Sequence, residues 1–404
     1  MVIGIDASRA NRKFKSGTEW YSYYLIRELA KLDAKNKYLL YSDKPLVDGL
    51  ADLTEHSPHH NFRAKILAWP FSFFWTQMRL SLEMILARPD VLFVPAHTLP
   101  YLHPRQSVMT IHDLGFIRER ELYSPDKMGP ENKVFRRVIN RLVKLLSRDK
   151  YGANTLDYLN WSTKFGLNHA KKVITVSNFS KREIMEIYGT DEKKIKVVYN
   201  GCNLSLYKKI TKQNIIDAVL NKYDISRPYI FYVGRLEKKK NISALANAYA
   251  IMREKYKKIN HKLVLVGAAS HGFDEMNYVI REFNLGNEVI ITGWIPEIDL
   301  PYIYNGASAF IFPSLYEGFG IPLLQAMACG TPIAASRAGS IPEVAGQAAL
   351  YFDPNDKREM ADKMAEIITN KDLRDKLVKQ GFKRVKNFSW QKCAKETLAV
   401  LENL

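Results

Sequence analysis

Residues Ala309–Ser336 read AFIFPSLYEGFGIPLLQAMACGTPIAAS and contain one complete strand, helix and strand. The short apolar runs Ala309–Phe312 and Pro332–Ala335 predict two buried parallel strands. Between them, Ile321–Cys329 predicts a helix with a proline in its first turn and a glycine directly after its end. This pattern is typical of an α/β domain built on a parallel sheet.

The entry to this helix is rich in glycine. Gly318 and Gly320 lie on either side of Phe319, so the backbone can turn sharply and approach a ligand closely. A helix N-terminus presents unpaired N–H groups and the positive end of the helix dipole, which favours a bound anion such as a phosphate. Glu317 would repel that anion, so we expect its carboxylate to accept hydrogen bonds from neutral hydroxyls, as on a sugar. The alternative is that Glu317 only complements the helix dipole and that Gln325 is a solvated position.

A second phosphate-binding pattern follows the predicted strand Tyr229–Val233. The sequence continues as GRLEKKKN and then as a predicted helix over Ile242–Met252, which places Arg235 and Lys240 on the connecting turn. The carboxyl ends of parallel strands are where open α/β sheets bind ligands. A guanidinium and an ammonium together suit a diphosphate, although a solvated basic loop would have the same composition.

The first half of the chain has two comparable turns. The predicted strand Val2–Asp6 leads through the basic, glycine-containing loop Ala7–Thr18 to a helix over Glu19–Leu32. A later predicted strand, Val108–Ile111, runs directly into His112–Asp113. A histidine at such an edge can contact a ligand, but a lone histidine can equally be a structural residue.

One segment is strongly basic and has helical periodicity. No acidic residue occurs from 132 to 147, and the basic positions share one helical face: Lys133, Arg137, Arg141, Lys144 and Arg148. This face is either solvated or binds anionic lipid headgroups. The stretch Trp69–Leu86 is unusually aromatic, and we expect its rings to pack in the core, with contact to an acceptor or a membrane surface as the alternative.

Composition limits the class of protein. The 404 residues are enough for two domains, and the net charge of +18 favours anionic partners. The three cysteines form no CxxC pair, which favours a reduced, cytoplasmic protein without disulfides or structural zinc. No apolar run is long enough to cross a membrane, and the N-terminus does not read as a signal peptide.

The stretch around Glu317 closely resembles the signature of family-4 glycosyltransferases, which are retaining enzymes with the two-domain GT-B fold. The family motif is a glutamate, seven residues and a second glutamate followed by AMACGTP, and here the second position holds Gln325. The strings VMTIHDLGF, VITVSNFSKREI and VGRLEKKKN also resemble this family. The resemblance implies two Rossmann-like parallel-sheet domains facing a cleft: residues 1–200 on the acceptor side, 201–387 for the nucleotide sugar, and a helix in 388–404 crossing back to the first domain.

The resemblance also implies roles for particular residues. His112 and Glu317 would contact the donor sugar, and Asp113 would orient the imidazole or contact acceptor groups. Gln325 would keep a weakened, uncharged contact to the nucleotide ribose. The remaining donor-binding positions that the resemblance implies are Arg235, Lys240, Ile295, Phe319, Gly320 and Ile321. Gly17 and Thr18 are further candidates, on a loop that is looser than the family's glycine pair, and a plain connecting loop is the alternative there.

The implied activity is transfer of a hexose from a nucleotide-diphosphate sugar to a hydroxyl. We expect mannose from GDP-mannose, with a UDP-hexose as the alternative donor, and a glycan acceptor linked to polyprenyl diphosphate at the inner face of the membrane. No metal or other cofactor is expected, because cationic side chains and a helix dipole would neutralise the diphosphate. Two other classes remain as alternatives: a non-catalytic nucleotide-sugar-binding homologue and a nucleic-acid-binding protein, although no nucleic-acid-binding signature is present.

Overall fold

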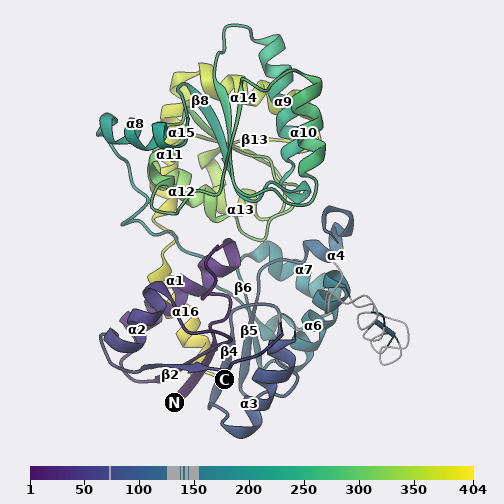
Figure 1. The fold of residues 1–404 in the computed structure, drawn as a ribbon, viewed down its shortest axis with the longest axis vertical. Helices are drawn as coiled ribbons and strands as arrows, with labels where there is room; N and C mark the ends of the chain where they lie inside the picture. The colour runs from purple at the N-terminus through teal and green to yellow at the C-terminus, as the bar shows by residue number, and fades with distance from the viewer. Residues whose placement is uncertain (72–73, 125–136, 138–139, 142–143, 145–153) are drawn as a thin grey trace. The chain divides into compact units, whose positions relative to one another are not determined.

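The computed structural model describes residues 1–71, 74–124, 137, 140–141, 144 and 154–404. The chain forms two compact units, shown in Figure 1. Unit 1 contains Met1–Asn200 and Trp390–Leu404, and unit 2 contains Gly201–Ser389. Each unit is built on one parallel sheet with helices on both faces, which confirms the predicted α/β class with two Rossmann-like domains.

The sheet of unit 1 has seven strands in the order β3-β2-β1-β4-β5-β6-β7, and every neighbouring pair is parallel. Strands β4 and β5 are buried along their whole length, which explains why β4 is a continuous apolar run. The two buried hydroxyls of β5 have partners: Ser107 donates to the Pro104 carbonyl, and Thr110 lies 3.1 Å from the Tyr21 hydroxyl. The strands are β1 (Val2–Asp6), β2 (Lys37–Ser42), β3 (Phe62–Ile66), β4 (Val91–Val94), β5 (Ser107–Ile111), β6 (Lys172–Thr175) and β7 (Ile195–Val197).

Helices cover both faces of this sheet (Figure 1). Right-handed crossovers place α1 and α2 on one face and α3, α6 and α7 on the other, where Met84, Leu156 and Ile184 pack in one core cluster. The helices are α1 (Gly17–Leu32), η1 (Asp48–Leu50), α2 (Ala51–His56), η2 (Trp75–Leu80), α3 (Ser81–Leu86), α4 (Gly115–Arg118), η3 (Arg120–Leu122), α6 (Thr155–His169), α7 (Asn178–Tyr188), η4 (Glu192–Lys194) and α16 (Trp390–Glu402).

The last helix of the chain, α16, belongs to unit 1 and packs on α1. Trp390 is buried at its first turn, and its ring stacks on Tyr24 with the centroids 5.3 Å apart. Tyr21 lies against the same indole at 6.2 Å. The expectation that the C-terminal helix returns to the first domain is therefore confirmed.

The sheet of unit 2 has six parallel strands in the order β10-β9-β8-β11-β12-β13. Strand β12 begins one residue later than predicted, after Pro332, whose carbonyl accepts from the Phe310 N–H at 2.9 Å. The strands are β8 (Tyr229–Val233), β9 (Lys262–Val266), β10 (Val289–Gly293), β11 (Ala309–Phe312), β12 (Ile333–Ser336) and β13 (Ala349–Phe352).

Helix α12 (Ile321–Cys329) has the predicted bounds, and a glycine lies at each end. Gly320 has φ +95° and Gly330 has φ +71°, and both conformations strain any residue with a Cβ. The other helices of unit 2 are α8 (Gln213–Lys222), η5 (Lys238–Lys240), α9 (Ile242–Lys255), α10 (Phe273–Glu282), α11 (Leu300–Gly306), α13 (Ile341–Ala345), η6 (Gly346–Ala348), α14 (Lys357–Thr369) and α15 (Lys371–Val385).

Both sheets reverse their strand order beside the first strand of the unit. The reversal lies between β1 and β4 in unit 1 and between β8 and β11 in unit 2. Ligands of open α/β sheets bind outside the carboxyl ends of the strands at this position. Among the described residues, no helix is both long enough and apolar enough to span a bilayer.

The packing of α16 on α1 predicts that Trp390→Ala destabilises unit 1. Removing a buried indole should lower the free energy of unfolding by about 3–5 kcal/mol, because the neighbouring rings cannot close the cavity. Urea denaturation followed by circular dichroism measures the change. Trp294→Ala, at an exposed tryptophan of unit 2, is the matched control and should change the free energy by less than about 0.5 kcal/mol. Equal losses in the two variants would contradict this account of the packing.

Candidate active site

The Glu317 carboxylate lies on the loop between β11 and α12, and its side chain is buried, with 7% of the residue exposed. Its Oε1 lies 2.6 Å from the Lys240 Nζ and accepts from the Ser314 hydroxyl at 2.7 Å. The ion pair compensates the buried charge, and the two contacts together hold Oε1 in position. Oε2 takes part in neither contact, so it can accept a hydrogen bond from a ligand hydroxyl.

The segment after β12 holds the backbone of Glu317 in place. The Glu317 carbonyl accepts from the Ser340 N–H at 3.1 Å and from the Ser340 hydroxyl at 3.0 Å. Gly339 has φ +56°, and a Cβ there would lie 2.6 Å from the same carbonyl oxygen, so only glycine fits. Sequence reasoning missed Ser314, Gly339 and Ser340, and the turn-forming pair Gly339–Ser340 was the only local signal for them.

The basic turn after β8 brings only one of its two predicted residues to Glu317. Lys240 contacts Glu317, which lies 77 positions later in the sequence. Arg235 is instead exposed, and its Nε lies 3.3 Å from the Glu237 Oε2. The turn is tied to the Glu317 loop by the Leu315 N–H, which donates to the Lys239 carbonyl at 3.0 Å. Lys240 is therefore not part of a freely solvated loop, whereas Arg235 can reorient toward a ligand.

Gln325 is half-buried in α12 and has a defined partner. Its Oε1 accepts from the Tyr304 hydroxyl at 3.1 Å. Burial raises the pKa of Tyr304 well above its usual value, so the phenol stays protonated and can donate. Gln325 is therefore not a solvated helix position, and sequence reasoning missed Tyr304, which lies on α11.

The other predicted donor-binding residues of unit 2 lie at the start of α12 and after β10. Gly320 is the N-cap of α12 and Ile321 its first residue, so their N–H groups belong to the unsatisfied first turn. Phe319 is buried and meets Phe388 edge to face at 5.8 Å. Ile295 is buried just after Gly293, which has φ +70°.

His112 follows β5 in unit 1 and is buried beside Tyr21, with ring centroids 4.8 Å apart. Its Nε2 lies 3.0 Å from the Pro95 carbonyl oxygen, which can only accept, so Nε2 carries the proton. Burial lowers the pKa of His112, which favours the neutral ring. The imidazole thus offers Nδ1 as an acceptor for a hydroxyl.

Asp113 acts locally on the turn that follows. Its Oδ1 accepts from the Gly115 N–H at 3.1 Å and lies 3.4 Å from the Tyr123 hydroxyl. These contacts fix the start of α4, while the carbonyl of Pro95 orients the neighbouring imidazole. The predicted role of Asp113 toward the imidazole or an acceptor stays a prediction.

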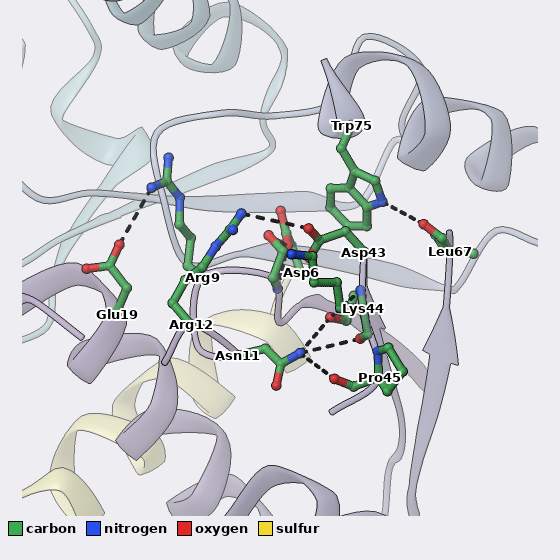
Figure 2. Close-up of polar contacts among 12 residues, drawn as sticks. Asp6, Arg9, Asn11, Arg12, Glu19, Asp43, Lys44, Pro45, Leu67 and Trp75 are labelled. Carbon is green, nitrogen blue, oxygen red and sulfur yellow. Dashed lines mark hydrogen bonds and ion pairs between the residues drawn. The ribbon is translucent and has the colours of Figure 1, made fainter. Parts of the chain in front are cut away.

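Gly17 and Thr18 lie in the first turn of α1, not in the loop before it, because Glu19 closes a capping box on Ser16. The Ser16 N–H donates to the Glu19 Oε2 at 3.1 Å, and the other carboxylate oxygen lies 3.5 Å from Arg9 (Figure 2). Burial raises the pKa of Glu19, but the hydrogen bond from Ser16 and the charge of Arg9 lower it by more. A carboxylate of this chain therefore accepts from the N-cap residue of this helix, and the predicted contact of Gly17 and Thr18 with the donor stays a prediction.

The remaining predictions concern the aromatic and the basic segments. Trp75 is buried, and its Nε1 donates to the Leu67 carbonyl at 2.9 Å, as Figure 2 shows, so it packs in the core as expected. Phe71 is exposed, and Phe73 lies outside the described residues. In the basic segment Arg137, Arg141 and Lys144 are exposed, whereas Lys133 and Arg148 lie outside the described residues.

No group of three or more His, Cys, Asp or Glu side chains is arranged to hold a metal ion in the part of the chain that the structure describes. The three cysteines are buried and form no disulfide. The loops after β1 and β8 carry the ion pairs Arg9–Glu19, Arg235–Glu237 and Lys240–Glu317, together with helix termini.

Two family models together match most of the chain. "Glycosyltransferase Family 4" matches residues 15–206, and "Glycosyl transferases group 1" matches residues 216–384. The first match lies almost wholly within unit 1, and the second lies within unit 2.

Two of the similar proteins are bacterial mannosyltransferases. The chain is 28% identical over 315 residues to the O-antigen chain mannosyltransferase B of Escherichia coli, covering 77% of this chain and 80% of that protein. It is 25% identical over 358 residues to the O-antigen chain mannosyltransferase RfbU of Salmonella typhimurium, covering 86% of each.

Among solved structures, the sucrose-phosphate synthase of Thermosynechococcus elongatus superposes with a TM-score of 0.74 at 20% identity. The superposition covers 100% of this chain and 98% of that one, so the likeness in fold extends over both units. Taken together, the two matching family models and the two parallel sheets show that the chain belongs to the group 1 glycosyltransferases and has the GT-B fold.

Proposed function

We propose that this chain is a retaining mannosyltransferase that moves mannose from GDP-mannose to a hydroxyl of a glycan acceptor. The observation that carries the proposal is the buried contact of Glu317 with Lys240 and Ser314 beside the strand reversal of unit 2. The two O-antigen mannosyltransferases at 28% and 25% identity support mannose as the sugar and polysaccharide assembly as the process.

In this proposal Glu317 binds the sugar of the donor, and Lys240 binds its phosphate. The Glu317 Oε2 accepts hydrogen bonds from the hydroxyls of the sugar, while Lys240, held beside it, neutralises the adjoining phosphate. Arg235 leaves Glu237 to bind the diphosphate, which it can do because its side chain is 61% exposed. The first-turn N–H groups of α12 bind the remaining phosphate oxygens.

The reaction then proceeds without a covalent enzyme intermediate. The bond from the anomeric carbon to the diphosphate oxygen breaks, and the acceptor oxygen bonds to that carbon on the face the diphosphate leaves. The acceptor proton passes to an oxygen of the leaving diphosphate. Arg235, Lys240 and the α12 dipole stabilise the developing negative charge in place of a metal ion. The neutral His112 holds a sugar hydroxyl through Nδ1 and adds no charge near the reacting carbon.

A second candidate follows from Gln325. The resembled motif has a carboxylate at this position, and here an amide accepts from Tyr304 instead. An amide gives weaker hydrogen bonds to ribose hydroxyls than a carboxylate does. A homologue that binds nucleotide sugars without turning them over is therefore the alternative, and a UDP-hexose is the alternative donor.

The donor prediction is tested by a thermal-shift screen against GDP-mannose and the corresponding UDP-, ADP- and dTDP-sugars, with and without EDTA. A ligand at about 100 times its dissociation constant stabilises the folded chain by roughly 2.7 kcal/mol, which gives a clear shift. We expect the largest shift with GDP-mannose and no change with EDTA. A larger shift with a UDP-hexose would reassign the donor, and a shift abolished by EDTA would contradict metal-free binding.

Glu317→Gln tests the role of the carboxylate while keeping its shape. Turnover should fall at least about 100-fold, because charge-assisted contacts to the sugar are lost in the transition state. Binding of free GDP, measured by calorimetry, should fall far less than turnover, since Lys240 keeps its charge for the phosphates when its carboxylate partner is lost. Glu275→Gln, a similar change at an exposed residue of unit 2, should leave both quantities unchanged. If Glu317→Gln lost turnover and GDP affinity equally, the proposed role of Glu317 in binding the sugar would be wrong.

Gln325→Glu separates the two candidate functions. A carboxylate should accept from Tyr304 and from the ribose, so GDP-mannose should bind several-fold more tightly with its turnover retained. Gln347→Glu, an exposed position after α13, is the control and should change neither quantity. If the natural chain binds the donor without turnover and Gln325→Glu alters nothing, the non-catalytic candidate is correct.

A further inference from the structure

An uncovered apolar face extends over η2 and α3 of unit 1. Met78, Leu82, Ile85 and Leu86 follow one another at helical spacing, and their exposed fractions are 55%, 48%, 63% and 70%. Buried residues of the same helices, including Leu80 and Met84, pack into the core on the opposite side. These two short helices therefore have an apolar surface on the solvent side in addition to the one that holds them to the sheet.

The loop before β5 extends this surface. Tyr101 and Leu102 are 61% and 43% exposed, and the Leu102 N–H donates to the Ser81 hydroxyl of α3 at 3.3 Å. A hollow of about 400 Å³ lies between the loop and the helix, lined by Met84, Ile85, Arg88, Tyr101, Leu102 and His103. The Tyr101 ring stacks on Phe165 of α6, with the ring centroids 5.5 Å apart. We call Met78, Leu82, Ile85, Leu86, Tyr101 and Leu102 the α3 face.

Two arginines and one exposed carboxylate, Asp90, lie close in sequence to the residues of the α3 face. Arg88 and Arg105 are exposed beside it, and Arg88 lines the hollow itself. The one carboxylate of α3, Glu83, is turned away from solvent, where it pairs with Lys65 and with Arg79 at 3.1 Å. An anionic surface could therefore meet this face without repulsion from α3.

We propose that the α3 face docks unit 1 on the surface of an anionic lipid bilayer. Aliphatic side chains would enter the boundary between headgroups and acyl chains, and Tyr101 would lie at headgroup level. Arg88 and Arg105 can direct their charged ends to lipid phosphates while their stems stay on the apolar surface. Contiguous exposed apolar residues with cationic neighbours, on a chain of net charge +18, fit this occupant by charge as well as by hydrophobicity.

The test uses the full chain and vesicle flotation at two lipid compositions: phosphatidylcholine alone, and phosphatidylcholine with about a third of phosphatidylglycerol. The natural chain should float with the anionic vesicles and much less with the neutral ones. Ile85→Glu and Leu86→Glu should each weaken vesicle binding at least about tenfold, because each replaces buried apolar area with a charge of the same sign as the lipid. Arg88→Gln should weaken it several-fold and reduce its sensitivity to salt.

Ile298→Glu is the matched control, since Ile298 belongs to unit 2 and is 67% exposed, close to the value for Ile85. It should bind vesicles as the natural chain does, and thermal melting should show that all variants are folded. A second comparison combines Arg137→Gln, Arg141→Gln and Lys144→Gln, which neutralises the described part of the basic segment.

Four results would overturn the proposal. The first is that the natural chain does not bind vesicles at all, and the second is that Ile85→Glu binds them as well as the natural chain does. The third is that Ile298→Glu loses as much vesicle binding as Ile85→Glu, and the fourth is that the basic-segment variant loses all vesicle binding while Ile85→Glu loses none. Light scattering gives a fifth such result. If the natural chain is a dimer and Ile85→Glu is a monomer, the α3 face is an interface between copies of this chain. None of these results depends on the identity of the donor, so the docking proposal and the proposed activity fail separately.

Discussion

The buried ion pair between Lys240 and Glu317 is the constraint on which the arrangement of unit 2 depends. Either charge alone would lose several kcal/mol of solvation in this position, so each requires the other. The two residues come from turns after β8 and β11, which are adjacent strands where the order of the sheet reverses. The pair therefore forms only when the sheet has assembled in this order, and it then fixes both turns at the edge where a ligand can bind.

The polar groups around this pair are held by the protein before any ligand arrives. Ser314 orients the carboxylate of Glu317, and Ser340 holds its backbone. Electrostatic stabilisation is most effective when such groups do not have to reorganise during the reaction. Gln325 is held in the same way, because its amide oxygen accepts from the Tyr304 hydroxyl.

Much of the fold could be predicted from the sequence, because buried parallel strands are short apolar runs and glycines mark helix ends. The bounds of β11 and α12 were predicted to the residue. The pairing of Lys240 with Glu317 could not be predicted, since it joins turns 77 positions apart and depends on strand order. The capping box of Glu19 was missed although its signal is local: Ser16 is followed three residues later by a glutamate, whose carboxylate accepts from the Ser16 N–H.

The stretch from Trp75 to Leu86 shows a different limit of sequence reasoning. We expected the aromatic rings of this stretch to pack in the core, but its aliphatic residues carried no prediction of their own, because periodicity says which residues share a face and nothing about what covers it. In the structure Met84 lies in the core, whereas Ile85 and Leu86 lie in solvent. An uncovered aliphatic face lowers the solubility of a protein and contributes nothing to the stability of the unit itself. Its presence beside cationic residues is therefore better explained by contact with an anionic surface than by the folding of unit 1.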